Sequence, residues 1–474
     1  MPRLQTKPKR KRAKGVSLSP EERPLANLPD DVLENVFSFL PLVEAIKAST
    51  VSKRFKKSWR LNRNFVFGRE FSLRYNRDDL TALVDRHFDS HEGDQIQVFQ
   101  LQIDPIGVEE LIQKWLRICI HKGVQELEFY FFQPGFTLRA DSIDNLKSLR
   151  TLKLVYCDFQ VPPVLTSMQF LNTLVLWQLQ LPEDKLETLL CGCKLLETLD
   201  LFQCSVIRLA YIQVRNHRRF KVLKISCCAD LEEIVIDSPT LSSMFYCGYV
   251  VSIRFFNKVE LEEAIFNFEP ASYRSYLPSS LVDRLVLDIS HVKVLSASAL
   301  VPEAMAARVR NGYFRDANFC LENLTEFQLF MEGGLFCNPY DVLMFLQHCP
   351  KLEKLIIDLN DYNFDCGTYW ELHQKPNIDK FSDFNRLKDV KLKGFKFLPS
   401  ELEFVKILLQ RAISLETLIF VTPKNGRTKL NSEDKLKYKH IILSWKASPA
   451  AKVVLYEHSQ DKGEVTPSHP KCWF

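Results

Sequence analysis

The sequence predicts an α/β protein in which three short helices precede an irregular solenoid of repeats that share one parallel sheet. Two observations support this prediction. Apolar residues recur at helical spacing within residues 25–60, and an apolar-x-x-apolar-x-apolar unit recurs from Val124 onward at intervals of 22 to 25 residues. Further units after residue 380 are expected to cap the last edge of the sheet.

The stretch 25–60 predicts three short helices. Pro29 presets a helical φ, Asp30 places a carboxylate in the first turn, and Pro41 ends the first helix. The apolar positions of this first helix are Val32, Leu33, Val36, Phe37 and Leu40. A second helix is expected over about 43–48, and a third carries Val51, Phe55 and Trp59 on one face. So short a segment rarely buries enough surface to be stable alone, so its apolar faces should pack against something else.

This segment resembles an F-box. The family pattern is a Leu-Pro start, a Leu-Pro break and a Val-Ser-Lys-Arg-aromatic ending, and the chain has each part in order. The resemblance implies docking to a Skp-type adaptor, which links to a cullin and a ubiquitin-conjugating enzyme. The residues expected to contact the adaptor are Leu28, Pro29, Leu33, Leu40, Pro41, Val51 and Phe55. The alternative is an ordinary capped helical hairpin that packs into a core.

The repeating units lie within the spacing of leucine-rich repeats. They are Val124, Leu127 and Phe129; Leu149, Leu152 and Leu154; Leu171, Leu174 and Leu176; Leu196, Leu199 and Leu201; and Phe220, Leu223 and Ile225. The residues between the apolar positions are expected to face outward on the curved inner side of the sheet, either as a partner-binding surface or as a solvated one; examples are Lys153, Val175, Asp200 and Lys224. Cys157, Cys204 and Cys228, three places after a last apolar residue, are expected to pack in the core.

The spacing then shortens, which leaves no room for helices between strands. Two such units are Leu231, Ile234 and Ile236, and then Leu241, Met244 and Tyr246. The pattern is predicted to resume at Val282, Leu285 and Leu287; at Leu324, Phe327 and Leu329; and at Leu352, Leu355 and Ile357. Irregular insertions are expected at about 269–280, 295–319 and 360–379, and they are candidates for target contact.

Two further stretches resemble plant F-box proteins with leucine-rich repeats. A helix with Val-Asp-Arg at 84–86, a helix with Trp115 and a strand at 124–127 follow the order common in that family. The stretch from 386, including ASPAAKVVLYE at 447–457, resembles the C-terminal FBD region. The expected organisation is a basic disordered arm (1–24), the F-box (25–64), the connector and repeat array (65–379), the FBD-like cap (380–456) and a disordered tail (457–474).

The positive charge is concentrated at the N-terminus. Residues 1–14 carry seven Lys and Arg and no acid, more than the whole chain's net charge of +5, so the rest is slightly negative and no nucleic-acid binding is expected. Lys9, Arg10, Lys11 and Arg12 predict a nuclear targeting signal, or else a solvated charge run. The expected location is the nucleus, with the cytoplasm as a further possibility.

The sequence offers no recognisable catalytic machinery. It contains no phosphate-binding loop and no hydrolase or metalloprotease motif. His87 and His91, with Asp85 and Asp89, have helical metal-ligand spacing but no defined third ligand, and a solvated helix surface is the alternative. No apolar stretch is long enough to predict a membrane span, and the 13 scattered cysteines favour reduced thiols. We expect neither a cofactor nor a metal.

These features together predict a non-catalytic substrate-recognition subunit of an SCF-type ubiquitin ligase. The F-box would bind the adaptor, and the repeat array would hold an unknown target protein. One alternative is a nuclear scaffold that binds protein or nucleic acid without assembling a ligase. Another is a receptor whose pocket holds a small signalling molecule, although no residue of the sequence points to one.

Overall fold

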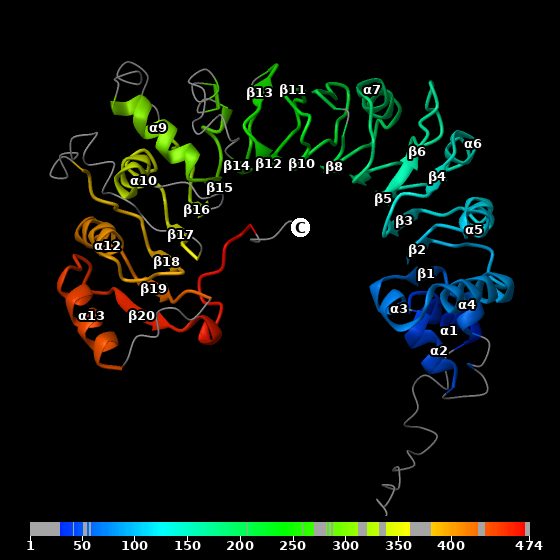
Figure 1. Cartoon of the computed structure of the whole chain (residues 1–474), viewed down its shortest axis with the longest axis horizontal. Coiled ribbons are helices and arrows are strands. Elements are labelled where there is room, and N and C mark those ends of the chain that lie inside the picture. The colour runs from blue at the N-terminus through cyan, green and yellow to red at the C-terminus, as the bar shows by residue number, and fades with distance from the viewer. Residues whose placement is uncertain are drawn as a thin grey trace, which may run out of the picture.

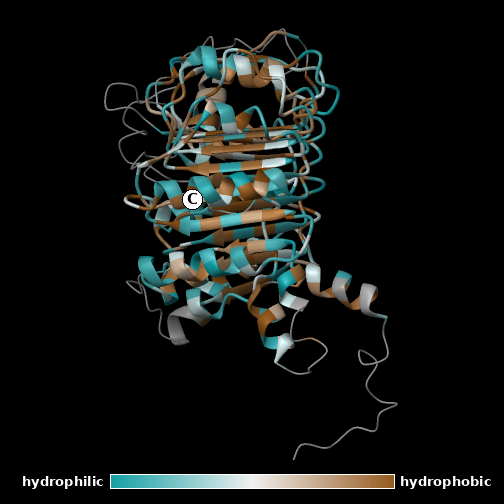
Figure 2. Cartoon of the chain, turned by 90° about the vertical axis from the view of Figure 1, so that its right-hand side faces the viewer, coloured by the Kyte–Doolittle hydropathy of each residue, from teal (hydrophilic) through white to brown (hydrophobic). Residues whose placement is uncertain are grey.

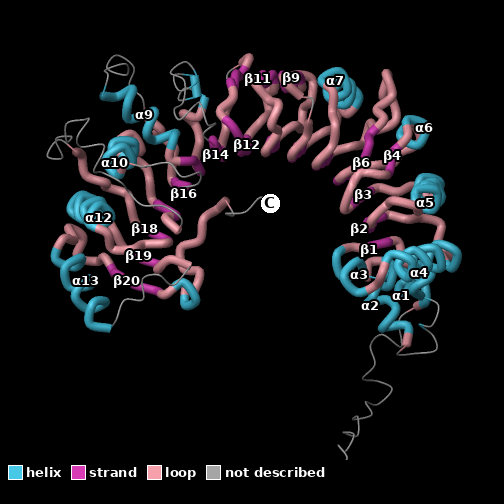
Figure 3. Tube along the Cα trace, viewed as in Figure 1, coloured by secondary structure: helices cyan, strands magenta, loops and turns pink. Residues whose placement is uncertain are grey.

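The computed structural model describes residues 29–40, 42–50, 55, 58–205, 207–257, 259–269, 281, 284–285, 288–310, 320–330, 338–360, 381–424 and 432–469. These residues form an arc in which the strands line the inner side and most of the helices cover the outer side (Figures 1 and 3). The F-box helices lie at one end of the arc and the FBD-like unit at the other. No helix in the described ranges is long and apolar enough to cross a membrane.

The inner side of the arc is one parallel sheet of 15 strands, paired in the order of the chain except where β4, β6, β9, β11 and β13 leave it. Figure 2 shows these strands stacked side by side as largely apolar rungs. The strands are β1 (Asn64–Phe67), β2 (Val98–Ile103), β3 (Glu126–Phe131), β5 (Thr151–Val155), β7 (Thr173–Trp177), β8 (Thr198–Phe202), β10 (Val222–Ser226), β12 (Ser243–Tyr249), β14 (Glu263–Glu269), β15 (Val294–Ser298), β16 (Glu326–Phe330), β17 (Lys354–Asp358), β18 (Asp389–Lys393), β19 (Thr417–Val421) and β20 (Lys452–Tyr456). The predicted parallel-sheet solenoid is confirmed.

The helices pack their apolar faces against the outer side of the sheet. In α5, two glutamates in the first turn favour the helix start, and Ile112, Trp115, Leu116 and Cys119 are buried along one face. The helices of the array and cap are α3 (Arg69–Arg74), α4 (Arg77–Ser90), α5 (Glu109–His121), α6 (Ala140–Ile143), α7 (Glu183–Gly192), α9 (Leu300–Arg310), α10 (Pro339–Leu346), α12 (Pro399–Arg411) and α13 (Ser432–Ser444), followed by the short 3₁₀ helix η6 (His458–Gln460). The F-box contributes α1 (Asp30–Ser38), α2 (Leu42–Ser49) and the 3₁₀ helix η4 (Ser58–Leu61).

Strands replace helices on the outer side where the repeats are short. β9 (Leu209–Gln213), β11 (Glu233–Asp237) and β13 (Ser252–Phe255) form a separate three-stranded parallel sheet, and β4 (Phe136–Leu138) pairs with β6 (Cys157–Phe159). The prediction that no helix fits here is therefore confirmed. The unit Leu231, Ile234 and Ile236 was expected to be another rung of the main sheet, but it lies in this outer sheet instead.

Two strands of the main sheet fall where the sequence pattern did not place them. Residues 281, 284, 285 and 288 are helical, so the strand predicted around Leu285 is wrong there; Val282 and Leu287 of the same unit lie outside the described residues. The rungs here are β14 and β15, and β15 lies inside the stretch expected to be an irregular insertion. Their inward positions include Ala264 and Ala297, whose small side chains leave a weak apolar signal although both are fully buried.

A residue with a left-handed backbone conformation directly follows several strands of the main sheet. Tyr156, Gln178, Gln203 and Cys227 immediately follow β5, β7, β8 and β10 and have φ between 50° and 59°. Their amides still donate to the next strand, for example Cys227 N to Cys247 O at 2.7 Å, so the ladder continues into the turn. Cys157, Cys204 and Cys228 are buried just beyond these residues, which confirms their predicted packing role.

The residues after β20 do not form the disordered tail that the sequence predicts. Residues 457–469 are described, and those from Asp461 onward return across the inner face of the sheet, where they contact β18, β17, β16 and β15. This segment lacks apolar periodicity, and polar contacts hold it instead. Residues 470–474 lie outside the described ranges.

Gly394 occupies a position where only glycine fits. Its φ is +71°, and a Cβ there would overlap the backbone of Leu359 and Asn360. We predict that Gly394→Ala lowers the free energy of unfolding by about 1–2 kcal/mol from the left-handed conformation alone and further through the overlap. Urea denaturation would measure this loss.

Gly463 is the matched control, because it has the same φ but open space around the position of a Cβ. Gly463→Ala should therefore cost clearly less than Gly394→Ala. Equal losses would contradict the claimed overlap.

Candidate functional site

The F-box helices close around a small core of their own. Leu33 and Phe37 from α1 and Phe55 form this cluster, with Leu40 and Ala48 packed against it. The rings of Phe37 and Phe55 lie 5.1 Å apart. The aromatic residue of the Val-Ser-Lys-Arg-aromatic ending therefore holds the segment together from within.

The predicted adaptor-binding residues divide into three groups. Leu33 and Phe55 are 3% and 8% exposed, so they support the segment from inside rather than presenting their side chains to a partner. Pro29 is exposed, and Leu40 is half-buried. Leu28, Pro41 and Val51 lie outside the described residues, as do Lys9, Arg10, Lys11 and Arg12 of the predicted targeting signal.

An exposed apolar face lies on the same helices. Val32, Val36 and Phe39 follow helical spacing along and just beyond α1, and they are 40%, 42% and 59% exposed. Ile46 on α2 is 43% exposed. We call Val32, Val36 and Phe39 the docking face. A cluster of exposed apolar side chains on a small domain marks an interaction site. The periodicity that predicted α1 from the sequence did not distinguish these exposed side chains from the buried ones.

The F-box is joined to the first rung of the sheet by specific contacts. Leu42 belongs to the main hydrophobic core of the array. The buried Asn62 donates from Nδ2 to the carbonyl of Leu40 at 2.8 Å. Trp59 stacks on His87 of α4 at 5.5 Å, and Arg60 pairs with Glu92 at 2.6 Å. These contacts orient the docking face relative to the sheet.

The strand register places one row of side chains along the concave face. The row runs across neighbouring strands as Gln100, Glu128, Lys153, Val175, Asp200, Lys224, Phe245, Ile265, Ser296, Gln328, Ile356, Lys391 and Ile419. The sequence-based placement of Lys153, Val175, Asp200 and Lys224 on one face is thus confirmed. The row alternates charged and apolar stretches, which gives the face a distinctive chemical pattern.

The middle of the concave face contains a shallow hollow. Its lining includes Trp177, Asp200, Lys224 and Phe245. Trp177 Nε1 donates to Asp200 Oδ1 at 3.1 Å, and the ammonium of Lys224 lies 5.5 Å from the centre of the Phe245 ring. Burial raises the pKa of Asp200, although the Trp177 hydrogen bond partly offsets this shift.

A second set of polar residues lies beyond the hollow, on β15 to β18. Glu326 is 5% exposed and pairs with Lys354 at 2.8 Å, while Lys391 is 1% exposed and pairs with Asp461 at 2.8 Å. Burial alone would raise the pKa of Glu326, but hydrogen bonds from Lys354 and Ser468 outweigh it and the net shift is downward. Sequence analysis did not single out these residues. Lys391 has the same register position as Lys153, and Glu326 and Lys354 occupy the outward position two residues earlier on their strands.

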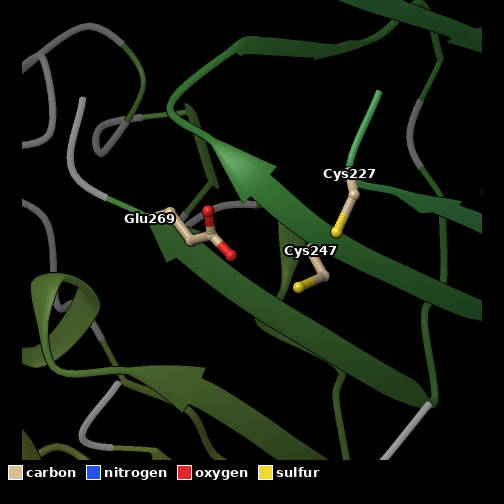
Figure 4. Close-up of side chains that lie close together, drawn as sticks. All are labelled: Cys227, Cys247 and Glu269. Atoms are coloured by element: carbon tan, nitrogen blue, oxygen red, sulfur yellow. The ribbon is translucent and has the colours of Figure 1, made fainter. Parts of the chain in front are cut away.

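The concave face also brings together three potential metal ligands. The sulfurs of Cys227 and Cys247 and a carboxylate oxygen of Glu269 lie within 4.8 Å of one another (Figure 4). Asn267 Nδ2 donates to the sulfur of Cys247 at 3.5 Å. Two thiols and a carboxylate are a donor set that Zn²⁺ accepts. Sequence reasoning missed this group because its members come from successive strands about 20 residues apart.

His87 and His91, which the sequence offered as possible metal ligands, lie in an aromatic environment instead. His87 and His91 are buried and pack their rings against Phe65 at 4.3 Å and 5.0 Å. Asp85 instead accepts from Lys114 at 2.8 Å and from Trp115 Nε1 at 2.9 Å, which lowers the pKa of its carboxyl. The alternative prediction of a solvated helix surface is therefore wrong for both histidines, because their side chains belong to an aromatic core.

The helical segment and the curved array together define an F-box protein with leucine-rich repeats. Comparison with protein families agrees, because the F-box domain matches residues 25–67 and the family described as "At1g61320/AtMIF1, LRR domain" matches residues 88–454. The chain belongs to this At1g61320/AtMIF1 family of leucine-rich-repeat proteins. F-box domains generally bind Skp-type adaptors, and the domain pair indicates a protein of the substrate-adaptor type.

Curated relatives span nearly the same length. The chain is similar to the putative FBD-associated F-box protein At1g61330 of Arabidopsis thaliana, with 32% identity over 426 residues that cover 88% of this chain and 95% of the relative. It is 31% identical to the FBD-associated F-box protein At1g61320 of the same plant, over 88% of this chain and 93% of the relative. These findings confirm the resemblance to plant F-box proteins with leucine-rich repeats and an FBD-like region.

His87 makes stability depend on pH. Burial, with a smaller contribution from the nearby His91, lowers its pKa to about 3. The folded state therefore keeps the ring neutral, whereas the unfolded chain protonates it below its ordinary pKa of 6.5.

We predict that the free energy of unfolding falls as the pH falls from 6.5 toward 3, and that His87→Phe reduces this loss. Urea midpoints measured across the range would test this, with His121→Gln as an exposed control that keeps the wild-type slope. An unchanged slope in His87→Phe would contradict the assignment.

Proposed function

We propose that this chain is the substrate-recognition subunit of an SCF-type ubiquitin ligase. The observation that carries the proposal is the attachment of an F-box with an exposed apolar docking face to one end of a curved sheet whose concave face carries a patterned row of side chains. The ligase chemistry would reside in the partners. The chain would act by binding, since the family to which it belongs is typically one of non-catalytic adaptors.

The docking face is the surface proposed to meet a Skp-type adaptor and, through it, a cullin. Val32, Val36 and Phe39 present apolar side chains in a row that a complementary groove would cover. Leu33 and Phe55 would contribute indirectly, because their burial fixes the orientation of α1.

The concave face is the surface proposed to hold the target protein. Because the F-box shares a core with the first rung, a target held in the arc would keep a defined position relative to the adaptor. Such positioning raises the effective concentration of the target near the ubiquitin-conjugating enzyme, which is how a non-catalytic receptor accelerates transfer.

Substituting a residue of the docking face should weaken adaptor binding without unfolding the chain. We predict that Val36→Glu lowers the affinity for purified Skp-type adaptor at least tenfold, because it places a charge in an apolar contact, a loss of about 1.4 kcal/mol or more. Pull-down and titration calorimetry would measure it.

Leu73→Glu is the matched control, because Leu73 is 76% exposed but lies on α3, outside the docking face. It should bind adaptor like the wild type. If wild-type chain of normal melting temperature captures no adaptor, the ligase role is rejected.

The basic N-terminal run is proposed to direct the chain to the nucleus. We predict that replacing Lys9, Arg10, Lys11 and Arg12 by Gln removes nuclear accumulation of a fluorescent fusion large enough not to diffuse through pores. A control with Lys462→Gln, which lies at the other end of the chain, should accumulate normally. Unchanged accumulation of the first variant would exclude the targeting role.

A further inference from the structure

Residues Asp461–His469, which we call the C-terminal strap, cross the concave face of the sheet. Figure 1 shows the chain leaving β20 and turning back into the space enclosed by the arc. The contacts of the strap follow in reverse order of the strands. Asp461 meets Lys391 on β18, Thr466 meets Lys354 on β17, and Ser468 meets Glu326 on β16.

Three side chains of the sheet bind the main chain of the strap. Lys391 Nζ donates to the carbonyl of Glu464 at 3.0 Å, and Lys354 Nζ donates to the carbonyl of Thr466 at 3.2 Å. The amide of Ser468 donates to Glu326 Oε1 at 2.6 Å. From Glu464 through Thr466 to Ser468, each step of two residues therefore reaches the next strand. Two extended residues span about 6–7 Å and strands lie about 4.8 Å apart, so the strap crosses the sheet at a slant. Any extended peptide offers these main-chain groups.

Two side chains at the end of the strap make the binding selective. The hydroxyl of Ser468 donates to Glu326 Oε2 at 2.7 Å. The imidazole of His469 lies 2.8 Å from Ser296 Oγ through Nδ1, and its ring meets Phe245 edge-on at 5.6 Å. Burial lowers the pKa of His469 to about 4, so the ring is neutral near pH 7. The site thus fits a hydroxyl residue followed by a neutral, hydrogen-bonding ring.

The strap supplies hydrogen-bonding partners to two charged groups beneath it, of which Glu326 also pairs with Lys354 of the sheet. Glu326 and Lys391 are at most 5% exposed although both point away from the core of the array. Buried charges are costly unless they are paired, and the strap supplies hydrogen-bonding groups to both. A segment that displaced the strap would have to supply the same groups.

We propose that the concave face over β15 to β18 is a binding site for an extended peptide segment of a target protein, and that the C-terminal strap occupies this site as an internal competitor. The target segment would present a hydroxyl residue to Glu326 and a following imidazole or similar ring to Ser296 and Phe245. This inference rests on the proposed role of the chain as a substrate receptor. The hollow lined by Asp200 and Lys224 includes Phe245 in its lining, so it lies next to the position of the ring.

The test compares peptide binding by the full-length chain with the strap bound and with the strap released. The release variant is Ser468→Asp with His469→Asp, which sets one carboxylate against Glu326 and another against the ring of Phe245. The probe is a fluorescent peptide of residues 461–469 with blocked ends, followed by anisotropy. We expect the release variant to bind it at least tenfold more tightly than the wild type, because its site is vacant.

The matched control is His458→Asp with Ser459→Asp, which replaces the same residue types at exposed positions before the strap. It should bind the probe as weakly as the wild type. Hydrogen exchange at the amide of Ser468 verifies the release, because this amide should exchange slowly in the wild type and in the control and fast in the release variant.

A second pair of substitutions tests the site itself within the release variant. Glu326→Gln should remove the gain in peptide binding. Glu353→Gln should retain it, because Glu353 lies just before β17 and its carboxylate pairs with Lys388, just before β18, at 3.0 Å. The proposal is overturned if the folded release variant binds the probe no better than the wild type, or if the wild-type amide of Ser468 exchanges fast.

Adaptor capture is measured on the same samples. Its loss would reject the ligase role and leave the peptide result intact, so the two failures are distinguishable.

Discussion

The structure depends on the register of parallel strands whose side chains alternate between the core and the concave face. Leu127, Leu152 and Leu174 are equivalent positions on successive strands, and each is fully buried. Burial of one such side chain contributes about 1.5–3 kcal/mol. A slip of one residue would move a whole apolar row to the surface, so the register is strongly specified. The same constraint that stabilises the fold therefore selects the residues that face the concavity.

The functional surfaces follow from this constraint. The outward row passes from Glu128 and Lys153, which pair at 2.7 Å, through Phe245 and Ile265 to the polar groups near Gln328. A target that spans several strands meets a fixed order of charged, apolar and polar groups. The F-box adds a second surface of a different kind, which is apolar and is held by contacts to the first rung. One end of the molecule thus carries the proposed adaptor surface, and the inner face carries the proposed target surface.

Regular periodicity made much of this architecture predictable. The helices around Val84 and Trp115 and the outward position of Asp200 follow from patterns that neighbouring residues repeat. Prediction failed where the pattern was weak. β14 and β15 were missed because Ala264 and Ala297, which face the core, are only weakly apolar. At Ile234, no local signal distinguishes a strand of the main sheet from one of the outer sheet.

The candidate site was harder to predict than the fold because it depends on contacts between distant parts of the chain. Ser468 and Glu326 are 142 residues apart, and Ser296 and His469 are 173 apart. A polar segment without periodicity gives no sign that it will cover a sheet. The F-box motif identified the segment, but burial separated the supporting Leu33 and Phe55 from the exposed Val36.

The central claim is that the F-box helices form the adaptor interface while the adaptor leaves the concave face uncovered. Hydrogen exchange of the full-length chain, with and without saturating Skp-type adaptor, tests this most directly. The account predicts new protection in α1 and α2 and unchanged exchange in β5 to β17. Protection spread over the strands of the concave face, or no protection in α1 and α2 of a folded chain, would contradict it.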